Sequence, residues 1–378
     1  MTQEHKNRAN DKRLESLDIL RGFDLFMLVF FQPVFMALAR ELKWPFLDPI
    51  VKQFGHVHWE GFAAWDIIMP LFMFMAGVSM PFSLNKYVGN NQGKGRVYIR
   101  IFKRFILLFF LGMIVQGNLL SLDADRVYLY SNTLQAIATG YIITALIYLW
   151  FNVKGVIISI IALLFIYWLP MSLCGDFTPD GNFAEYIDRA ILGRFRDGAT
   201  LNDDGTWNFS PYYRYTWIWS SLNFAVTVML GFITGNIMKK YSTDGKKILK
   251  KVVVTGILLV LSGLALSGHM PIIKKIWSSS MTLFSGGICM LLMALFYYIV
   301  DYKGWGRGLA WLKIYGMNSI AAYMLGQVIN FRCVAHSVTH GLQQFMGDYY
   351  DVWLTFANYL ILFFILRAMY KSKIFLKV

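Results

Sequence analysis

Long apolar windows alternate with short polar segments along most of the chain. Ten windows have the length, about 17 to 22 residues, that a helix needs to cross a hydrocarbon core about 30 Å thick. They lie at roughly 19–39, 63–83, 101–118, 132–150, 155–171, 216–238, 252–269, 280–300, 314–334 and 351–369. The pattern predicts an all-α polytopic membrane protein with about ten transmembrane helices.

The composition agrees with one membrane domain and gives no sign of a second. Hydrophobic residues make up 57% of the 378 residues, charged residues make up 15%, and the mean hydropathy is +0.48. We therefore treat residues 1–378 as a single transmembrane domain, with an N-terminal segment at 1–18 and a long outer loop at 172–215. We expect no cleavable signal peptide, because the long polar start is not followed by a small-residue cleavage site.

Lysine and arginine are unevenly distributed among the polar segments. Positive loops resist translocation, so the side richer in these residues is expected to be cytosolic. If the N-terminus is inside, most of the 36 basic residues fall on the inner side, for example in 84–104 and 239–251. Both termini are therefore expected in the cytosol. The net charge of +14 largely reflects this asymmetry, so we expect no nucleic-acid partner.

With this topology, five of the six histidines lie at or near the outer ends of the predicted helices. Histidine suits membrane interfaces because its ring is amphipathic, which explains many such positions. His56 differs because Asp66 enters the apolar window just after it. A carboxylate inside a span costs about 2.5 to 3.5 kcal/mol, so Asp66 is expected to face a protein interior or an aqueous cavity. A packing role for Asp66, bonded to a neighbouring span, is an alternative interpretation.

The first apolar window carries polar groups at its inner end. Asp18, Arg21 and Asp24 recur at i, i+3 and i+6, so they can form a charge-balanced strip on one helix face. Gln32 follows Arg21 by eleven residues, which is about 20° in azimuth and about 16 Å along an ideal helix. We therefore expect one polar face from the inner boundary towards the outer half. A paired anchor at the cytosolic surface explains the strip equally well.

Several stretches resemble a known family. The opening RLESLDILRG and the segment HVHWEGFAAWDIIMP at 56–70 resemble the transmembrane acetyltransferases related to heparan-alpha-glucosaminide N-acetyltransferase. The pattern His-x-x-Trp-x-Gly-x-x-x-x-Asp-x-x-x-Pro falls on His56, Trp59, Gly61, Asp66 and Pro70. The pieces TLQAIATGY, PIIKKIWSSS and YGMNSIAAY agree more loosely, so the resemblance covers most of the chain and is weakest between 172 and 216.

The resemblance implies an enzyme that takes acetyl-CoA from the cytosol and acetylates the amine of a glucosamine unit on the outer side. His56 falls on the catalytic histidine, as a transient acetyl carrier or a general base, and imidazole suits both roles near neutral pH. Gln32 stands where relatives have asparagine. It keeps an amide that can donate to an oxyanion, with a different reach. Asp66 completes the expected catalytic set.

Other polar residues are candidates for contact with the two ligands. Those expected to bind the acceptor are Trp59, His58, Lys274 and Asn318. Those expected to bind CoA are Asp18, Arg21, Arg100 and Arg104. General membrane features offer simpler explanations: positive inner loops, snorkelling lysines, an interfacial aromatic belt and interhelical hydrogen bonds. No zinc spacing is present, so no metal is expected.

Three functions are compatible with these residues. The first is the membrane-embedded N-acetyltransferase. The second is an O-acyltransferase of a surface polysaccharide, because LDILRG also resembles the opening of the broader membrane acyltransferase group. The third is a proton-coupled amino-sugar transporter, in which Asp66 and His56 relay protons and no CoA site is needed. The expected location is a bacterial inner membrane, and the sequence leaves the acceptor glycan and a homo-oligomer open.

Overall fold

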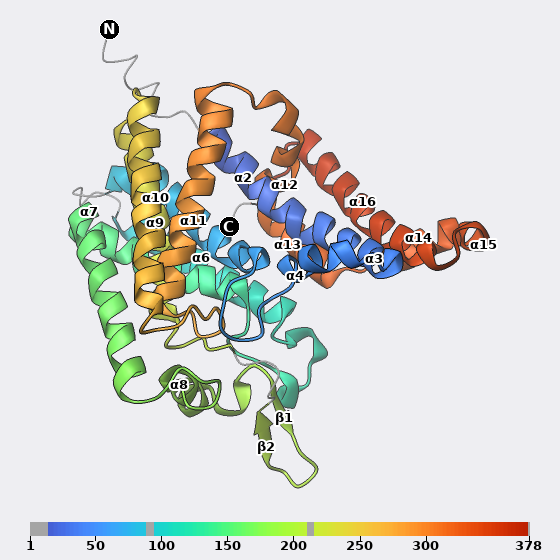
Figure 1. Cartoon of the computed structure of the whole chain (residues 1–378), viewed down its shortest axis with the longest axis horizontal. Helices are drawn as coiled ribbons and strands as arrows, with labels where there is room; N and C mark the ends of the chain where they lie inside the picture. The colour runs from blue at the N-terminus through green and yellow to red at the C-terminus, as the bar shows by residue number, and fades with distance from the viewer. Residues whose placement is uncertain (1–13, 88–93, 210–214, 377–378) are drawn as a thin grey trace. The chain divides into compact units, whose positions relative to one another are not determined.

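The computed structural model describes residues 14–87, 94–209 and 215–376, and these residues are largely helical (Figure 1). They divide into two compact units. The first unit contains Val57–Phe62 and Met69–Ala294, and the second contains 14–56, 63–68 and 295–376. Residues 1–13 of the expected N-terminal segment and 210–214 of the expected outer loop lie outside the described residues.

The first unit consists mainly of long helices. These are α5 (Ile68–Leu84), α6 (Lys94–Val115), α7 (Thr133–Leu173), α9 (Ser221–Lys240), α10 (Gly245–Ser267) and α11 (Ser279–Tyr297). In its apolar window α9 is 78% buried, whereas α7 is 17% and α10 is 22% buried. Helix α9 is therefore enclosed by protein, while α7 and α10 expose large apolar side chains such as Ile158 and Leu258. Such outward apolar faces are what contact with lipid requires.

Helices α5 and α9 approach each other closely through glycine. A methyl group added at Gly231 would lie 1.9 Å from the carbonyl oxygen of Phe74, and one at Gly77 would lie 1.9 Å from that of Val228. Small residues allow membrane helices to pack backbone against backbone, which replaces the hydrophobic drive that lipid does not supply. Any larger residue at either position would force these two helices apart.

Helix α7 contains two of the expected spans, 132–150 and 155–171. It is kinked at Asn152, which has a φ of 56° and a ψ of −161°. Its start is fixed by a capping box: the Asn132 side chain accepts the N–H of Leu134 at 2.7 Å, and the Gln135 side chain accepts that of Asn132 at 3.1 Å. These amides satisfy the helix terminus, where main-chain donors would otherwise lack partners.

The expected outer loop is an ordered part of the first unit over its described residues. It contains helix α8 (Phe183–Leu192) and a hairpin of β1 (Ala199–Leu201) and β2 (Trp207–Phe209). The strands are antiparallel, with Thr200 opposite Asn208. The segment therefore carries its own secondary structure, as Figure 1 shows.

The second unit begins with a continuous, apolar helical stretch, Glu15–Leu42, which we call the first rod. Helix α2 (Glu15–Phe26) continues through a π-helical segment, Met27–Phe31, into α3 (Gln32–Leu42). The remaining helices are α4 (Asp48–Gln53), α12 (Lys313–Met317), α13 (Ser319–Val328), α14 (Arg332–Thr339), α15 (Gln343–Met346) and α16 (Tyr350–Lys371). A methyl group at Gly22 would lie 1.9 Å from the carbonyl oxygen of Leu312, so α2 packs tightly against the segment that leads into α12.

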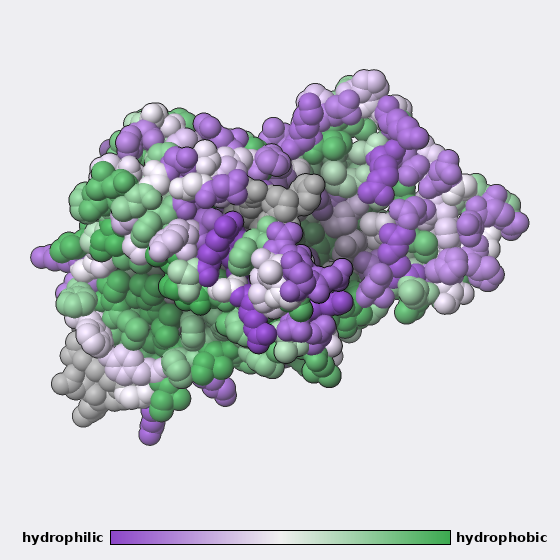
Figure 2. All heavy atoms as spheres, turned by 90° about the horizontal axis from the view of Figure 1, so that it is seen from below, coloured by the Kyte–Doolittle hydropathy of each residue, from purple (hydrophilic) through white to green (hydrophobic). Residues whose placement is uncertain are grey.

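Seven helices among the described residues are long and apolar enough to cross a membrane. This confirms the prediction of an all-α membrane protein. The other expected windows have specific explanations. Helix α7 combines two windows, α6 carries Arg100, Lys103 and Arg104 within its apolar stretch, and the 314–334 window is divided at Asn318 into α12 and α13. Figure 2 shows broad apolar areas on the face that it presents.

Candidate active site

A buried aspartate holds the candidate catalytic histidine within the second unit. His56 Nδ1 lies 2.7 Å from Asp66 Oδ1. The other carboxylate oxygen, Asp66 Oδ2, accepts the main-chain N–H of Ala63 at 3.0 Å. Asp66 lies in the 3-10 turn Ala64–Ile67 that leads into α5, and a helix start favours a carboxylate. The Asp66 side chain is 2% exposed and that of His56 is 46% exposed, so a buried anion orients an accessible imidazole.

This pair defines the chemistry of the ring. A carboxylate can only accept hydrogen bonds, so the proton between the two groups belongs to Nδ1 of His56. The neutral ring then carries its lone pair on Nε2. In hydrolase triads an aspartate plays the same part, because it fixes the tautomer and stabilises the imidazolium that forms. His56 is thereby suited to accept a proton or to attack a carbonyl carbon.

The turn before His56 is tied to its surroundings on two sides. Gln32 Nε2 donates to the main-chain oxygen of Phe54 at 3.3 Å. Gln53 Oε1 accepts the N–H of Ala64 at 2.9 Å, and the Phe54 ring packs against Phe35, with centroids 4.9 Å apart. Sequence reasoning missed Gln53 and Phe54. No motif marks them, because both act through the main-chain geometry of a turn.

The π-helical segment changes which residues share a face of the first rod. The N–H of Gln32 bonds to the carbonyl of Met27, five residues back. A π segment acts like one inserted residue, so it sets the following helix back by about 100°. Gln32 therefore lies about 80° from Arg21, not about 20°, and about 20° from Asp24. The expected polar face from Arg21 to Gln32 is replaced by one that joins Asp24 and Gln32.

The polar strip expected on α2 is only partly paired. Arg21 Nη1 lies 3.9 Å from Asp18 Oδ1, and Asp18 is 6% exposed. Asp24 is 0% exposed, and neither of its carboxyl oxygens has a hydrogen-bond partner among the described residues. The three residues thus do not form one charge-balanced group.

In the first unit, the segment after His56 is fastened to two distant loops. The Trp59 indole donates to the carbonyl of Phe177 at 2.8 Å, and the N–H of Gly61 donates to that of Ile272 at 2.9 Å. The Trp59 ring also packs against a buried cluster that includes Ile273. These contacts give Trp59 a structural role, and its contact with the acceptor stays a prediction. His58 is exposed, and its contact with the acceptor also stays a prediction.

The two remaining acceptor candidates are buried. Lys274 is 7% exposed and lies in the loop before α11, where its carbonyl accepts the N–H of Trp277 at 3.0 Å. Asn318 is 0% exposed and lies in the second unit. Its amide nitrogen donates to the carbonyl of Ile374 at 3.1 Å, and its oxygen accepts the N–H of Leu376 at 3.1 Å. Asn318 thus joins the helix break to the end of the chain.

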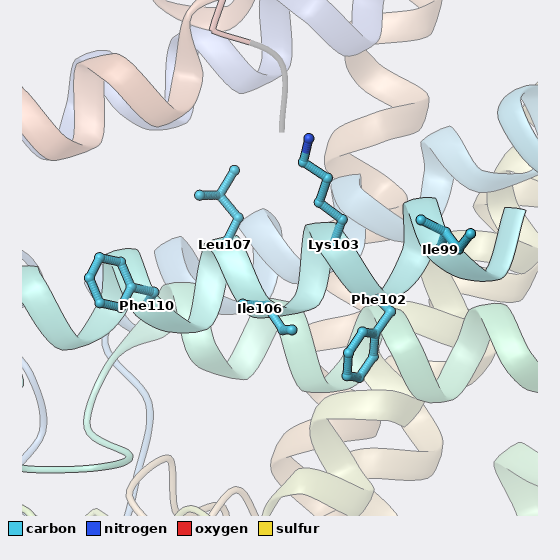
Figure 3. A pocket seen from close by; sticks show the side chains of 6 residues that line it. All are labelled: Ile99, Phe102, Lys103, Ile106, Leu107 and Phe110. Atoms are coloured by element: carbon cyan, nitrogen blue, oxygen red, sulfur yellow. The ribbon is translucent and has the colours of Figure 1, made fainter. Parts of the chain in front are cut away.

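The basic candidates on α6 have different surroundings. Arg100 is exposed. Arg104 is half-buried and stacks on Tyr141, with its guanidinium carbon 4.2 Å from the ring centroid. A hollow of about 460 Å³ on this helix is lined by Ile99, Phe102, Lys103, Ile106, Leu107 and Phe110 (Figure 3). With five apolar side chains and one lysine, the hollow suits acyl chains better than phosphate groups.

A second group of buried charges lies in the described part of the expected outer loop and directly after it. Arg196 is 1% exposed and forms an ion pair with Glu185. Asp188 accepts the main-chain N–H of Trp217 at 2.7 Å, and Asp197 accepts its indole N–H at 3.1 Å. Burial raises the pKa of Asp188 to about 7 and that of Asp197 to about 8, although these hydrogen bonds and Arg196 act in the opposite direction. We call these five residues the outer polar network.

The comparisons with known proteins point to one family. A family model described as "Heparan-alpha-glucosaminide N-acetyltransferase, catalytic" matches residues 13–178. Heparan-alpha-glucosaminide N-acetyltransferase of Mus musculus is 24% identical over 376 residues, covering 86% of this chain and 55% of the relative. The protein of the same name from Homo sapiens is 25% identical over 361 residues, covering 82% and 52%. The chain spans about half the length of these curated relatives.

Proposed function

Because this chain is related to the heparan-alpha-glucosaminide N-acetyltransferase family, we propose that it is a membrane-embedded acetyltransferase. It moves an acetyl group from acetyl-CoA to the amine of a glucosamine-type sugar. The observation that carries this proposal is the 2.7 Å contact between His56 and buried Asp66, directly before the apolar helix α5. This pair supplies an oriented imidazole where the family match falls.

Two routes use the same ring. In the first, Nε2 of His56 attacks the thioester carbonyl, the C–S bond breaks and CoA leaves as a thiolate. The sugar amine then attacks the acetyl-imidazole, the bond to Nε2 breaks, and the amine proton passes to the ring. In the second, the amine attacks the thioester directly, the C–S bond breaks, and Nε2 takes the amine proton. Asp66 stabilises the imidazolium in both routes.

Gln32 has a supporting part in either route. An amide NH₂ carries two donor hydrogens, and one of them bonds to the carbonyl of Phe54 at 3.3 Å. The second hydrogen is a donor for the oxyanion that develops on the acetyl carbonyl. At the donor end, Asp18, Arg21, Arg100 and Arg104 are the proposed contacts of CoA, with the arginines on its phosphates. His58, Trp59, Lys274 and Asn318 are the proposed contacts of the acceptor.

We propose that the acetyl group is transferred across the membrane. Both termini and the CoA end lie in the cytosol, ten segments cross the bilayer, and the sugar is met on the outer side of a bacterial inner membrane. The distribution of lysine and arginine supports this orientation. Proteoliposomes in which one side alone receives acetyl-CoA and the other alone receives glucosamine test it. Transfer that requires both ligands on the same side would refute the proposed sidedness.

The activity itself is tested with the purified full chain in detergent. Radiolabelled acetyl-CoA and glucosamine are supplied, and the label on the sugar amine is measured for wild type, His56→Ala and His340→Ala. We expect His56→Ala to lose about 100- to 10,000-fold in rate, because that is the range that a general base contributes. The matched control His340→Ala removes an exposed histidine and is expected to retain activity.

Each other outcome has a definite meaning. Label found on a sugar hydroxyl favours the O-acyltransferase. Unlabelled glucosamine that accumulates in proteoliposomes, with no label on any sugar, favours the transporter. Full activity of His56→Ala removes His56 from the chemistry.

A further inference from the structure

Asp24 of α2 is a buried carboxyl group that no described residue satisfies. It is 0% exposed, and both Oδ1 and Oδ2 lack a hydrogen-bond partner among the described residues. Burying such a group inside a membrane helix is costly unless hydrogen bonds satisfy it. Unsatisfied buried groups are rare in native proteins. Asp24 therefore indicates a ligand atom that the described chain does not provide.

Asp24 does not lie on the side of α2 that packs against the segment leading into α12. Gly22 packs against the main chain at Leu312, where an added methyl would lie 1.9 Å from the carbonyl oxygen. Asp24 follows two residues later, about 200° around the helix, so it points away from that contact. Around the helix axis, Arg21 lies about 60° from Asp24, and its Nη1 lies 3.9 Å from Asp18 Oδ1. Asp24 is thus neither a helix-packing residue of this interface nor a member of that ion pair.

The π-helical segment brings Asp24 into line with Gln32. Without this segment, eight residues would separate the two side chains by about 80°. The segment Met27–Phe31 reduces this to about 20°. The two residues then lie on one face, about 12 Å apart along the axis. A ligand that lies along this face passes from Asp24 to the amide beside the His56 turn.

We propose that Asp24 accepts a hydrogen bond from an amide N–H of the pantetheine arm of the acetyl donor. This inference rests on the proposed function. The arm is an extended chain that joins the phosphates of CoA to its thioester and carries secondary amides. An amide N–H satisfies a carboxyl oxygen without bringing a second charge into the membrane.

The position of Asp24 favours a contact with the pantetheine arm over a contact with the thioester or the attacking amine. The thioester must reach His56, and Gln32 donates to the turn that carries His56. A group about 12 Å nearer the N-terminus of the same rod lies too far away to touch the thioester or the attacking amine. It meets the chain that leads to the thioester.

The test compares two ligands of the purified full-length protein by titration calorimetry. CoA contains the arm, whereas adenosine 3′,5′-bisphosphate shares its nucleotide end and lacks the arm. We expect Asp24→Leu to weaken CoA about tenfold, because one hydrogen bond to a buried carboxyl is lost, and to leave the bisphosphate unchanged. Asp24→Asn keeps an acceptor oxygen and should lie between wild type and Asp24→Leu. Val29→Ala, on the side of the rod that contacts Gly326, is the matched control.

The outcomes that overturn the proposal are distinct. Unchanged CoA affinity in Asp24→Leu overturns it, and so does an equal loss for both ligands, which indicates a disturbed fold. If Asp24→Leu does not fold, CoA with a photoreactive diazirine in its arm is cross-linked to wild type. Label within residues 20–28 supports the proposal, and label only elsewhere overturns it. Wild type that binds the bisphosphate and not CoA refutes the Asp24 contact, and wild type that binds neither refutes the proposed function.

Discussion

Two groups of buried carboxylates, one in each unit, use their oxygens in different ways. In the second unit, one carboxyl oxygen of Asp66 accepts a main-chain N–H and the other bonds to the ring of His56, whose side chain is 46% exposed. In the first unit, Asp188 and Asp197 bond to Trp217, and Glu185 pairs with the buried Arg196. The carboxyl groups are buried in both. Only the first group ends in an accessible imidazole ring.

This difference separates a candidate for catalysis from a framework. The partners of the outer polar network are main chain, an indole and a guanidinium, and none of these exchanges a proton near neutral pH. The network therefore fixes the start of α9 relative to α8, within the first unit. The Asp66 pair fixes a ring that is still accessible, so its variants should lower activity with little loss of stability, while those of the network should do the reverse.

The largest expected effect is the removal of Arg196. Arg196→Met leaves Glu185, which is 3% exposed, paired with the half-exposed Arg189 at 2.8 Å. Breaking a buried ion pair by removing one partner costs about 3 to 5 kcal/mol when the remaining charge is uncompensated, so the retained Arg189 pair places this loss towards the lower end of that range. We expect a lower unfolding temperature in detergent and unchanged acetyl transfer per folded molecule.

Arg194→Met is the matched control for this change. Arg194 pairs with Asp125 at 3.4 Å, but both side chains are close to half exposed, and such surface pairs contribute about 0 to 1 kcal/mol. An equal loss of stability in both variants would show that burial does not set the strength of the Arg196 pair.

The second effect is on the Asp66 pair. Asp66→Asn keeps the shape and an acceptor for the N–H of Ala63. The amide can instead donate to Nδ1, which places the ring proton on Nε2 and removes its lone pair. We expect the transfer rate to fall about 100-fold, with little change in the unfolding temperature. A normal rate in Asp66→Asn would assign Asp66 to packing.

The third effect concerns the pH dependence of stability. Burial raises the pKa of Asp188 to about 7 and that of Asp197 to about 8, above the ordinary value near 4. The folded protein then binds more protons than the unfolded chain between these values, so stability falls as pH rises through this window. The loss is at most about 1.4 kcal/mol per pH unit for each group. We expect the unfolding temperature to fall between pH 5 and pH 8, on the order of a few degrees per unit.

Asp197→Asn identifies the source of this pH dependence. Its amide oxygen still accepts from the Trp217 indole, but the group no longer titrates, so the decline near pH 8 should weaken. Asp203→Asn, an exposed position, should keep the wild-type profile. Identical profiles for wild type and Asp197→Asn would exclude Asp197 as the cause.

The sequence predicted the parts that depend on composition and spacing. Apolar length predicted the membrane helices, and the resemblance motif marked His56 and Asp66 as candidate catalytic residues, but their contact was not predicted and is shown by the structure. The π-helical segment Met27–Phe31 was not predictable, because it arises from packing and carries no residue signature. Because of this segment, Gln32 points in a different direction around the helix from the one calculated for an ideal α-helix. That Asp24 has no hydrogen-bond partner among the described residues was not predictable either, since side-chain pairing depends on neighbours that spacing does not reveal.

The smallest expected effect tests whether activity depends on the length of the Gln32 side chain. Gln32 meets the carbonyl of Phe54 at 3.3 Å, and Gln32→Asn, shorter by one methylene, cannot make this contact from the same backbone position. One hydrogen bond of about 1 kcal/mol corresponds to roughly a fivefold lower rate, with CoA affinity unchanged because the contact lies at the turn of His56. Gln32→Leu removes the amide altogether. If Asn and Leu lose activity equally, the bond to Phe54 is what matters. If Asn keeps most of the rate and Leu does not, the amide acts on the reacting carbonyl, and Gln32 joins Asp66 as a residue whose polar atoms serve the chemistry and not the fold.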